Sequence, residues 1–273
     1  EDGIRDVERS RGLGDVYKRQ MKKAASISEE AKPEILDINY GCPVKKVACR
    51  GAGAGILLDL DKMQKMTAEI VKQVNIPVTV KTRLGWDDNS IKIVEVAKRL
   101  QDVGIQALTI HGRTRKQMYK GEANWDYIAQ VKNDPNITIP IFGNGDINSP
   151  EKAKEYKEKY GVDGIMIGRA AIGNPWVFNQ IKQFLKEGKF LNKPDIKERI
   201  NVVKKHLEFS IKWKGEKLGL IEMRRHYTNY FRAIENFKEY RMKLILSESL
   251  DYSLDVLNDI SNKFNSIEER SVV

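Results

Sequence analysis

Residues capable of chemistry follow five apolar segments of this chain, each at the point where the segment ends. The first is Cys42, in the turn Gly41-Cys42-Pro43, where Gly41 permits an unusual backbone angle and Pro43 fixes the exit. A thiol held at a strand end could serve in acid–base chemistry, or it could be a small side chain buried in a turn. The later segments end on further polar or glycine-bearing residues: Lys81 and Arg83, His111 and Arg113, Asn144 and Asp146, and Gly168 and Arg169.

The segments that must position these residues alternate between two patterns. Short apolar runs predict strands over 35–39, 76–81, 107–111, 139–142 and 164–167. Amphipathic runs predict helices between them, over about 61–74, 90–103, 125–132 and 150–160. This alternation predicts an α/β fold with right-handed βαβ units and a parallel sheet whose strands are apolar on both faces. Because the carboxyl ends of parallel strands share one edge, the five strand ends predict a single functional site.

Two turns rich in glycine follow the last two predicted strands. In parallel barrels, the backbone N–H groups of such turns and a short extra helix hold a cofactor phosphate. Asn144-Gly145-Asp146 and Gly168-Arg169, with the segment 170–173, fit this role, although they could also be ordinary glycine turns. The glycine-rich loop 51–55 lacks the spacing of a phosphate-binding loop, so we predict that it packs closely against neighbouring backbone.

The two ends of the chain differ from the alternating region. Residues 1–20 interleave five basic and five acidic residues with glycine and show no regular period, which indicates a disordered or foreign leader. A helix tail is predicted over 21–31. After a helix over 175–187 and a linker over 189–194, the remaining residues show only helical patterns, over 196–213, 218–231, 236–246 and after 249.

Positive charge is concentrated in one stretch of the chain. The formal net charge is +10, and residues 191–243 hold 14 Lys or Arg against 7 Asp or Glu. This balance favours a polyanionic partner. Within the stretch, Arg224 and Arg225 lie beside Tyr227, a pattern typical of RNA contact and also of a solvated helix face.

Cysteine, histidine and apolar content exclude several classes of protein. Cys42 and Cys49 do not have the spacing of a disulfide framework or a zinc site, which favours a reducing cytoplasm. The three histidines are too scattered to predict a metal centre. The apolar runs are too short to span a membrane, so we expect neither a membrane nor a metal as partner.

Taken together, these motifs resemble those of the tRNA-dihydrouridine synthases, and most of all the bacterial B-type subfamily. The shared pattern consists of Asp37-Ile38-Asn39-x-Gly41-Cys42-Pro43, Val78-Thr79-Val80-Lys81-x-Arg83, Ile110-His111-Gly112-Arg113-Thr114-Arg115, Asn144-Gly145-Asp146 and Met166-Ile167-Gly168-Arg169. The resemblance implies a TIM (β/α)8 barrel that binds FMN, followed by an all-helical C-terminal domain that binds tRNA. It also implies NADPH or NADH as reductant, and we expect a cytoplasmic monomer.

The resemblance implies a role for each motif residue. Cys42 matches the catalytic cysteine that protonates the uracil ring, and Lys81 matches a lysine that contacts the flavin. Asn39 and His111 match residues near the flavin and the substrate base. The FMN phosphate would be held by the two glycine turns, through Asn144, Gly145, Asp146, Gly168 and Arg169. Substrate contacts are expected from Arg83, Arg113, Arg115, Arg224 and Arg225.

These residue types suit the implied reduction. The C5–C6 double bond of uracil is conjugated to a carbonyl, so hydride from the reduced flavin can add at C6, and the resulting enolate needs a proton at C5. A thiol is mostly protonated at neutral pH and can supply that proton. A cation such as Lys81 favours the anionic reduced flavin. A base within folded RNA must be extruded before it can stack on the flavin.

The chain departs from the family in its number of strands. The family barrel has eight, whereas the five predicted here match the fourth to the eighth. We therefore expect an N-terminally truncated barrel over 21–188, joined to an unrelated leader, and a helical tRNA-binding domain over 195–273. Five βα units cannot close a barrel and would leave two edge strands exposed. Weak or absent FMN binding is the expected consequence.

Other functions stay open at this stage. Another FMN barrel, such as a dihydroorotate or dihydropyrimidine dehydrogenase, carries related strand-end residues, but a free base does not need a basic helical domain. An inactive truncated remnant could still bind RNA through its helices. A purely structural protein would leave the five polar strand ends unexplained.

Overall fold

The computed structural model describes residues 19–232 and 234–270. The chain divides into two compact units, one formed by Glu1–Ile147 and Lys152–Ile167 and the other by Asn148–Glu151 and Gly168–Val273. The leader predicted over 1–20 lies almost wholly outside the described residues. Residues 19–30 form a helix, close to the range of 21–31 that the sequence predicts.

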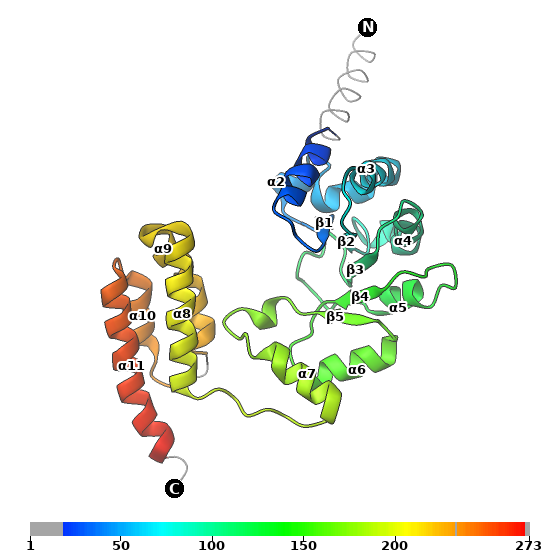
Figure 1. Cartoon of the computed structure of the whole chain (residues 1–273). Helices are drawn as coiled ribbons and strands as arrows, with labels where there is room; N and C mark the ends of the chain where they lie inside the picture. Colours follow the sequence, from blue (N-terminus) through cyan, green and yellow to red (C-terminus); the bar gives the residue numbers. More distant parts are fainter. Residues whose placement is uncertain (1–18, 233, 271–273) are drawn as a thin grey trace. The chain divides into compact units, whose positions relative to one another are not determined.

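The first unit is built on a five-stranded parallel sheet in the order β1-β2-β3-β4-β5 (Figure 1). Its strands are β1 (Leu36–Asn39), β2 (Val78–Arg83), β3 (Ala107–His111), β4 (Ile141–Asn144) and β5 (Gly164–Met166). Strands that are consecutive in the chain are neighbours in the sheet and run parallel. The predicted parallel α/β architecture is therefore confirmed, and all five strands overlap their predicted ranges.

Helices and short 3-10 turns occupy the connections between the strands. They are α2 (Lys45–Ala48), η1 (Gly53–Leu58), α3 (Leu60–Gln73), η2 (Asp88–Ser90), α4 (Ile93–Asp102), α5 (Asp126–Lys132) and α6 (Pro150–Tyr160). The structure confirms the four predicted helices, which are α3, α4, α5 and α6. The sequence did not predict α2, η1 and η2, because segments of three to six residues contain too few turns to display a period.

One face of the sheet is apolar and packs under helices. Val80 and Leu108 lie opposite one another on β2 and β3 and are fully buried. Helix α3 turns Met63 and Ile70 toward this core, and burial of each such side chain stabilises the fold by about 1.5–3 kcal/mol. The helix begins at Asp59, whose carboxylate accepts a hydrogen bond from the N–H three residues on, at 2.9 Å.

The opposite face of β1 and β2 is polar, so the expectation of strands apolar on both faces is wrong for these two strands. The same face of β4 and β5 carries Phe142 and Met166. Because side chains alternate along a strand, Thr79 and Lys81 lie on the face opposite Val80. The register places Asp37 beside Thr79, whose hydroxyl donates a hydrogen bond to the Asp37 carboxylate at 2.7 Å, and places Asn39 beside Lys81. These four polar side chains are half-buried or exposed, so they retain contact with water.

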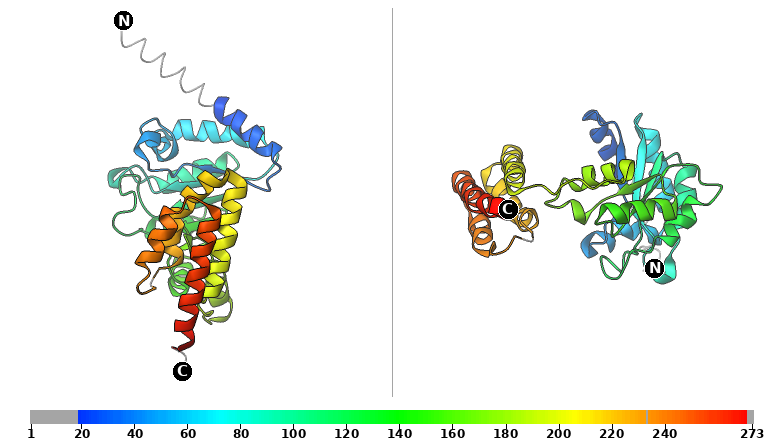
Figure 2. Two further views of the ribbon diagram at one scale, coloured as in Figure 1. Left: turned by 90° about the vertical axis from the view of Figure 1, so that its left-hand side faces the viewer. Right: turned by 90° about the horizontal axis from the view of Figure 1, so that it is seen from below.

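The second unit contains a helical bundle. The elements of this unit are η3 (Arg169–Ala171), α7 (Val177–Glu187), α8 (Ile196–Lys214), α9 (Glu216–Tyr230), α10 (Lys238–Leu246) and α11 (Leu250–Arg270). Figure 2 shows α8 to α11, coloured yellow to red, gathered into one bundle whose core includes Val203, Leu207, Met223 and Leu257. The predicted helices over 175–187, 196–213, 218–231 and 236–246, and the final helix, are confirmed. Helix α8 begins at Asp195, whose carboxylate accepts a hydrogen bond from the N–H of Glu198 at 2.7 Å.

Helices α8 and α9 approach closely because glycine lies at their contact. The Ser210 hydroxyl donates a hydrogen bond to the carbonyl oxygen of Gly219 at 3.3 Å. A Cβ at Gly219 would lie 2.8 Å from the Ile211 Cα, so a larger residue would push the helices apart. Over the described ranges, the structure contains no helix long and apolar enough to cross a membrane, and no three His, Cys, Asp or Glu side chains placed to hold a metal ion.

Gly143→Ala is expected to destabilise the first unit, because a Cβ there would lie 2.0 Å from the buried ring of Trp125. The ring cannot easily retreat, since its Nε1 donates a hydrogen bond to the Gly145 carbonyl oxygen at 3.0 Å. We expect the free energy of unfolding in urea to fall by about 1–3 kcal/mol. Gly41→Ala is the control, because a Cβ there meets only ordinary contacts from 3.5 Å. Equal losses in the two variants would contradict the packing argument.

Candidate active site at the carboxyl edge of the sheet

Polar side chains from four neighbouring strands meet at the carboxyl edge of the sheet. The register places Asn39 beside Lys81, and it places His111 between Arg83 and Asn144. Arg83 follows Lys81 by two residues, so these side chains share the polar face. The structure therefore brings together the predicted site residues of the first four strands.

The turn Gly41-Cys42-Pro43, called the cysteine turn below, is held from two sides. The Asn39 Oδ1 atom accepts a hydrogen bond from the N–H of Gly41 at 2.9 Å, and the Cys42 carbonyl oxygen accepts one from the N–H of Ala54 at 3.0 Å. A Cβ at Gly53 would lie 2.8 Å from the Cys42 Cβ, so the glycine-rich loop packs closely against this turn, as predicted. The thiol of Cys42 is half-buried. The expectation of an unusual backbone angle at Gly41 is wrong, because the φ of Gly41 is not positive. The side chain of Asn39 closes the turn instead.

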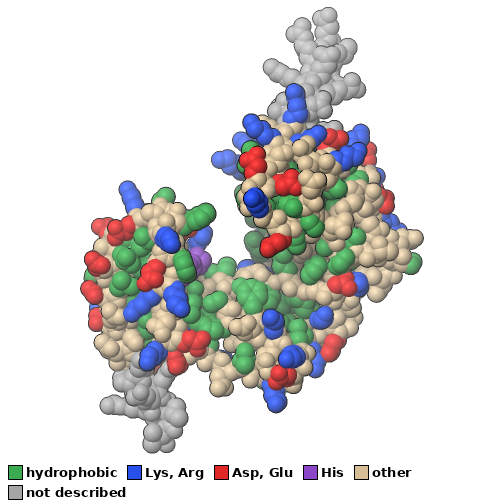
Figure 3. Space-filling view, in the orientation of Figure 1, with side chains coloured by type: hydrophobic (Ala, Val, Ile, Leu, Met, Phe, Trp, Pro, Cys, Tyr) green, Lys and Arg blue, Asp and Glu red, His purple; other side chains and the backbone are tan. Residues whose placement is uncertain are grey.

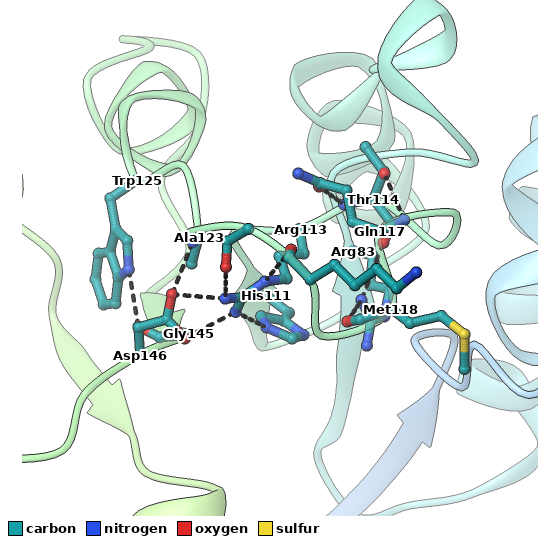
Figure 4. Close-up of polar contacts among 12 residues, drawn as sticks. Arg83, His111, Arg113, Thr114, Gln117, Met118, Ala123, Trp125, Gly145 and Asp146 are labelled. Carbon is teal, nitrogen blue, oxygen red and sulfur yellow. Dashed lines mark hydrogen bonds and ion pairs between the residues drawn. The ribbon is translucent and has the colours of Figure 1, made fainter.

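Arg83 ties the cysteine turn to the loop after β3. Figure 4 shows Arg83 with Thr114 and Met118 of that loop. Its Nε donates a hydrogen bond to the Gly41 carbonyl oxygen at 2.8 Å, and its Nη1 donates to the carbonyl oxygens of Thr114 and Met118 at 3.0 and 2.9 Å. Only 2 % of the residue is exposed, and this burial lowers its pKa to about 10, so the guanidinium stays charged at neutral pH. The structure thus gives Arg83 a positioning role, and contact with substrate stays a prediction.

A buried ion pair joins the loop after β3 to the turn after β4 (Figure 4). The two terminal nitrogens of Arg113 donate to the two carboxylate oxygens of Asp146 at 2.9 and 2.8 Å. The guanidinium also donates to the carbonyl oxygens of Lys120 and Gly121 at 3.2 and 2.6 Å. The Asp146 carboxylate accepts a further hydrogen bond from the N–H of Ala123 at 2.8 Å, and the Asp146 backbone is left-handed, with φ 57°. These contacts stabilise Asp146 in a left-handed backbone conformation, which is energetically unfavourable for residues other than glycine.

Lys81 and His111 lie among other cations. Burial lowers the pKa of Lys81 and Arg83 lowers it further, whereas Asp37 opposes the shift. Burial also lowers the pKa of His111, to about 3, with Arg83 and Lys81 adding to the effect. His111 is therefore neutral at physiological pH. Its Nε2 lies 3.5 Å from Nη1 of Arg113, which can only donate, so the imidazole hydrogen is assigned to Nδ1.

The turn after β4 packs directly against His111. A Cβ at Gly145, where φ is 129°, would lie 2.6 Å from the Ala123 Cβ and 3.1 Å from the His111 Cδ2, so only glycine fits. The Asn144 side-chain amide donates a hydrogen bond to the Met166 carbonyl oxygen at 2.8 Å, which ties β4 to β5. The predicted phosphate-binding turn is thus a closely packed element with a fixed backbone.

Arg115 and Tyr119 extend the site along the loop after β3. The Arg115 guanidinium carbon lies 4.6 Å from the centroid of the Trp86 ring, and its buried Nε has no hydrogen-bond partner. The centroid of the Tyr119 ring lies 6.4 Å from the centroid of the His111 ring. The same Tyr119 centroid lies 5.7 Å from the guanidinium carbon of Arg83. The sequence analysis missed Tyr119, because this residue does not directly follow a predicted strand. The only indication in the sequence was its position four residues after Arg115, the last residue of the motif.

Two of the predicted phosphate-binding residues belong to the second unit. Gly168 directly precedes η3, and a Cβ there would meet no atom within 4 Å. Arg169 begins η3, is exposed, and lines a cavity of about 320 Å³ together with Arg199 and Arg232. A phosphate contact by Gly168 and Arg169 stays a prediction.

The two arginines predicted to contact RNA occupy different environments on α9. Arg224 is half-buried, its Nη2 lies 3.4 Å from the Ser247 carbonyl oxygen, and its buried Nε has no hydrogen-bond partner. Arg225 is exposed and donates a hydrogen bond from Nε to Nε2 of His226 at 3.2 Å. Arg225 can therefore reach a ligand at the surface, whereas Arg224 is engaged with the bundle.

Comparison with known proteins agrees with the motif resemblance. The family model described as dihydrouridine synthase matches residues 9–265. The chain belongs to this family. The probable tRNA-dihydrouridine synthase of Rickettsia conorii is 38% identical over 247 residues, which cover 90% of this chain and 73% of that protein. tRNA-dihydrouridine synthase B of Vibrio cholerae is 40% identical, and the match covers 94% of this chain and 78% of that protein. tRNA-dihydrouridine synthase B of Pseudomonas putida is also 40% identical, and the match covers 82% of this chain and 66% of that protein.

In this dihydrouridine synthase family member, Arg113→Gln is expected to lower the free energy of unfolding by about 3 kcal/mol, because it leaves the Asp146 charge without its partner in a largely buried site. Lys132→Gln is the matched control, since the Lys132–Asp163 ion pair is partly exposed and such pairs contribute about 0–1 kcal/mol. Urea unfolding of both variants measures the difference. Similar losses would show that Arg113–Asp146 behaves as a surface pair.

The low pKa of His111 predicts a pH dependence of stability. The unfolded imidazole binds its proton near pH 6.5 and the folded one near pH 3, so the free energy of unfolding falls as pH falls between these values. Between about pH 7.5 and about pH 5 the expected contribution is about 2 kcal/mol. Urea unfolding of the wild type and His111→Gln over this range measures it. The wild-type curve should fall more steeply, and parallel curves would contradict the buried neutral imidazole.

Proposed function

We propose that this chain carries the active site of a tRNA-dihydrouridine synthase, which reduces the C5–C6 double bond of a uridine in tRNA, with FMN as cofactor and NADPH or NADH as reductant. The observation that supports this most directly is the register that places Asn39 beside Lys81, and His111 beside Asn144, at the edge that holds the cysteine turn. The names of the similar proteins support the same substrate and reaction.

The chemistry of this edge fits a flavin. Lys81 is a half-buried cation, and within the described residues its ammonium makes no hydrogen bond or salt bridge with another side chain. An ammonium in this setting gains free energy when an anionic group comes to lie beside it. We propose that Lys81, Asn39 and His111 hold the ring system of FMN, which, when bound, supplies the hydride for the uracil ring.

The turn after β4 is proposed to hold the phosphate of FMN, and a phosphate contact by the turn at Gly168 and Arg169 is proposed from the motif resemblance. The residues concerned are Asn144, Gly145, Asp146, Gly168 and Arg169. Backbone N–H groups of tight turns suit phosphate, and the fixed backbone at Gly145 supports this role. Since the Asp146 carboxylate is paired with Arg113, we assign Asp146 the task of fixing the turn.

Cys42 is proposed as the general acid that gives a proton to C5 of the uracil ring. Its half-buried thiol lies on a turn that Asn39 and Arg83 hold in one conformation, which reduces the entropy lost on reaching a reactive geometry. We propose that Arg83 acts on the substrate through this turn. Arg113 and Arg115 lie on the neighbouring loop, from which they would orient the base or its phosphate.

The second unit is proposed to bind the tRNA. The excess of Lys and Arg over residues 191–243 and the exposed guanidinium of Arg225 support a polyanionic partner. We keep the proposed division into a TIM-barrel part over 21–188 and a helical tRNA-binding part over 195–273. A tRNA substrate would place the reaction in the cytoplasm.

Replacing the proposed proton donor tests the function. Cys42→Ala is expected to lower the rate of uridine reduction by about 100-fold or more, whereas the amount of FMN bound and its reduction by NADPH should equal those of the wild-type chain. Cys49→Ala is the matched control, since this cysteine is exposed and lies outside the turn. Flavin absorbance after desalting, with and without added FMN, measures binding, and dihydrouridine formed in unmodified tRNA measures turnover.

The possible outcomes separate the parts of this proposal. A Cys42→Ala variant with unchanged turnover would contradict the role of the thiol. A chain that gains no flavin absorbance even with excess FMN would contradict the flavin site in this chain. The same spectrum tests the prediction of weak or absent FMN binding, which a flavin band that survives desalting would overturn.

A further inference from the structure

A groove on the helical bundle is lined by aromatic rings and cations. It lies along α8 and α9, has a volume of about 610 Å³, and is lined by His206, Phe209, Lys212, Trp213, Lys214 and Glu222, among others. Phe209 is 69% exposed and Trp213 is 84% exposed, which is unusual for large apolar side chains. Figure 3 shows green apolar, blue cationic and purple histidine side chains on the surface of this bundle. We call this site the ring groove.

The rings of the groove form a row along α8. His206, Phe209 and Trp213 are spaced by three and four residues, which places them on one face of the helix. The imidazole of His206 is fixed, because its Nδ1 lies 3.1 Å from the hydroxyl of Tyr230. Burial lowers the pKa of His206, and Arg225 lowers it further, so this ring is uncharged at neutral pH. The groove therefore offers a row of flat, uncharged faces.

Positive charges flank these rings. Helix α8 carries six Lys or Arg against two Glu. Glu222, the acidic residue of the groove, is paired with Lys214, which leaves Lys212 beside Trp213 to act on a ligand. Arg225 lies on the adjacent turn of α9 and donates a hydrogen bond to His226, whose ring centroid is 4.8 Å from that of His206. A ligand that carries both planar rings and negative charges matches this pattern.

We propose that the ring groove binds an unpaired segment of RNA, with nucleobases stacked on Trp213 and Phe209 and phosphates held by Lys212 and Arg225. Aromatic side chains with interleaved cations are the general means by which proteins hold single-stranded nucleic acid. This inference rests on the proposed tRNA substrate, and it assigns the contact to loop nucleotides that lie outside the reacting uridine.

Two other occupants fit the groove less well. A duplex keeps its bases stacked within the helix, so it cannot present their faces to Trp213. A second copy of this chain would bring two surfaces with an excess of positive charge together, and the repulsion between them opposes that contact. Single-stranded RNA satisfies both the rings and the cations.

The test compares a short single-stranded RNA oligonucleotide with a blunt duplex of the same sequence, using fluorescence anisotropy of labelled RNA and the whole chain at fixed salt. Trp213→Leu is expected to weaken binding of the single strand by about 5- to 100-fold, because leucine keeps the apolar surface but has no ring face. Trp213→Phe should retain most of the affinity. Binding of the duplex should change little.

Matched variants separate stacking from charge and from folding. Phe190→Leu removes another exposed ring, one that packs on Phe184 outside the groove, and should leave both RNAs unaffected. Lys212→Gln should weaken binding of the single strand. It should also reduce the slope of log affinity against log salt concentration by about one, the amount expected for the loss of one phosphate contact. Circular dichroism melting confirms that each variant is folded.

Three results would overturn the inference. The first is unchanged binding of the single strand by Trp213→Leu, and the second is an equal loss for single strand and duplex. The third is a wild-type dimer in solution that Trp213→Leu converts to a monomer, which would identify the groove as a contact between copies. Because the readout is RNA binding, it does not depend on whether the chain reduces uridine. Failure of the proposed reaction and failure of the groove are therefore distinguishable.

Discussion

The hydrogen-bonding demand of two buried guanidinium groups constrains the whole carboxyl edge of the sheet. A buried cation without partners costs several kcal/mol, so Arg83 and Arg113 must have most of their donors satisfied inside the protein. Their acceptors are carbonyl oxygens and the Asp146 carboxylate, which belong to three separate loops. In the observed arrangement the three loops satisfy both cations together. The Arg83 hydrogen bond to Gly41 holds the turn that carries Cys42, and the sheet register places His111 between Arg83 and Asn144.

The same cations determine the electrostatics of the edge. Besides burial, both cations help to keep His111 neutral, and Arg83 adds to the lowering of the pKa of Lys81. Adding a further positive charge there is therefore unfavourable, and adding a negative one is favourable. The polar face of β1 and β2 gives such a ligand access, while the apolar face keeps the sheet packed under its helices. Structural stability and ligand chemistry thus occupy opposite faces of the same strands.

The second unit separates stability from recognition in a similar way. The inner faces of α8 to α11 form a closed apolar core, and the outer face of α8 carries rings that the described bundle leaves exposed. The close contact at Gly219 holds α8 against α9. Rings from one helix and cations from both can therefore act on one ligand.

The sequence by itself determined the order and type of the strands and longer helices, the parallel sheet and the meeting of strand-end residues. These depend on local periodicity and on the rule that parallel strands end at one edge. It also determined the family. Only the tertiary structure decided how those residues are used. Arg83 holds the cysteine turn from 42 residues away, a contact that no local pattern shows. The Asn39–Gly41 hydrogen bond and the alternating polar side chains of β1 and β2 are local features that the sequence analysis missed. The row formed by His206, Phe209 and Trp213 was present in the sequence, but exposure of its rings depends on how α9 packs against α8, which no local pattern encodes.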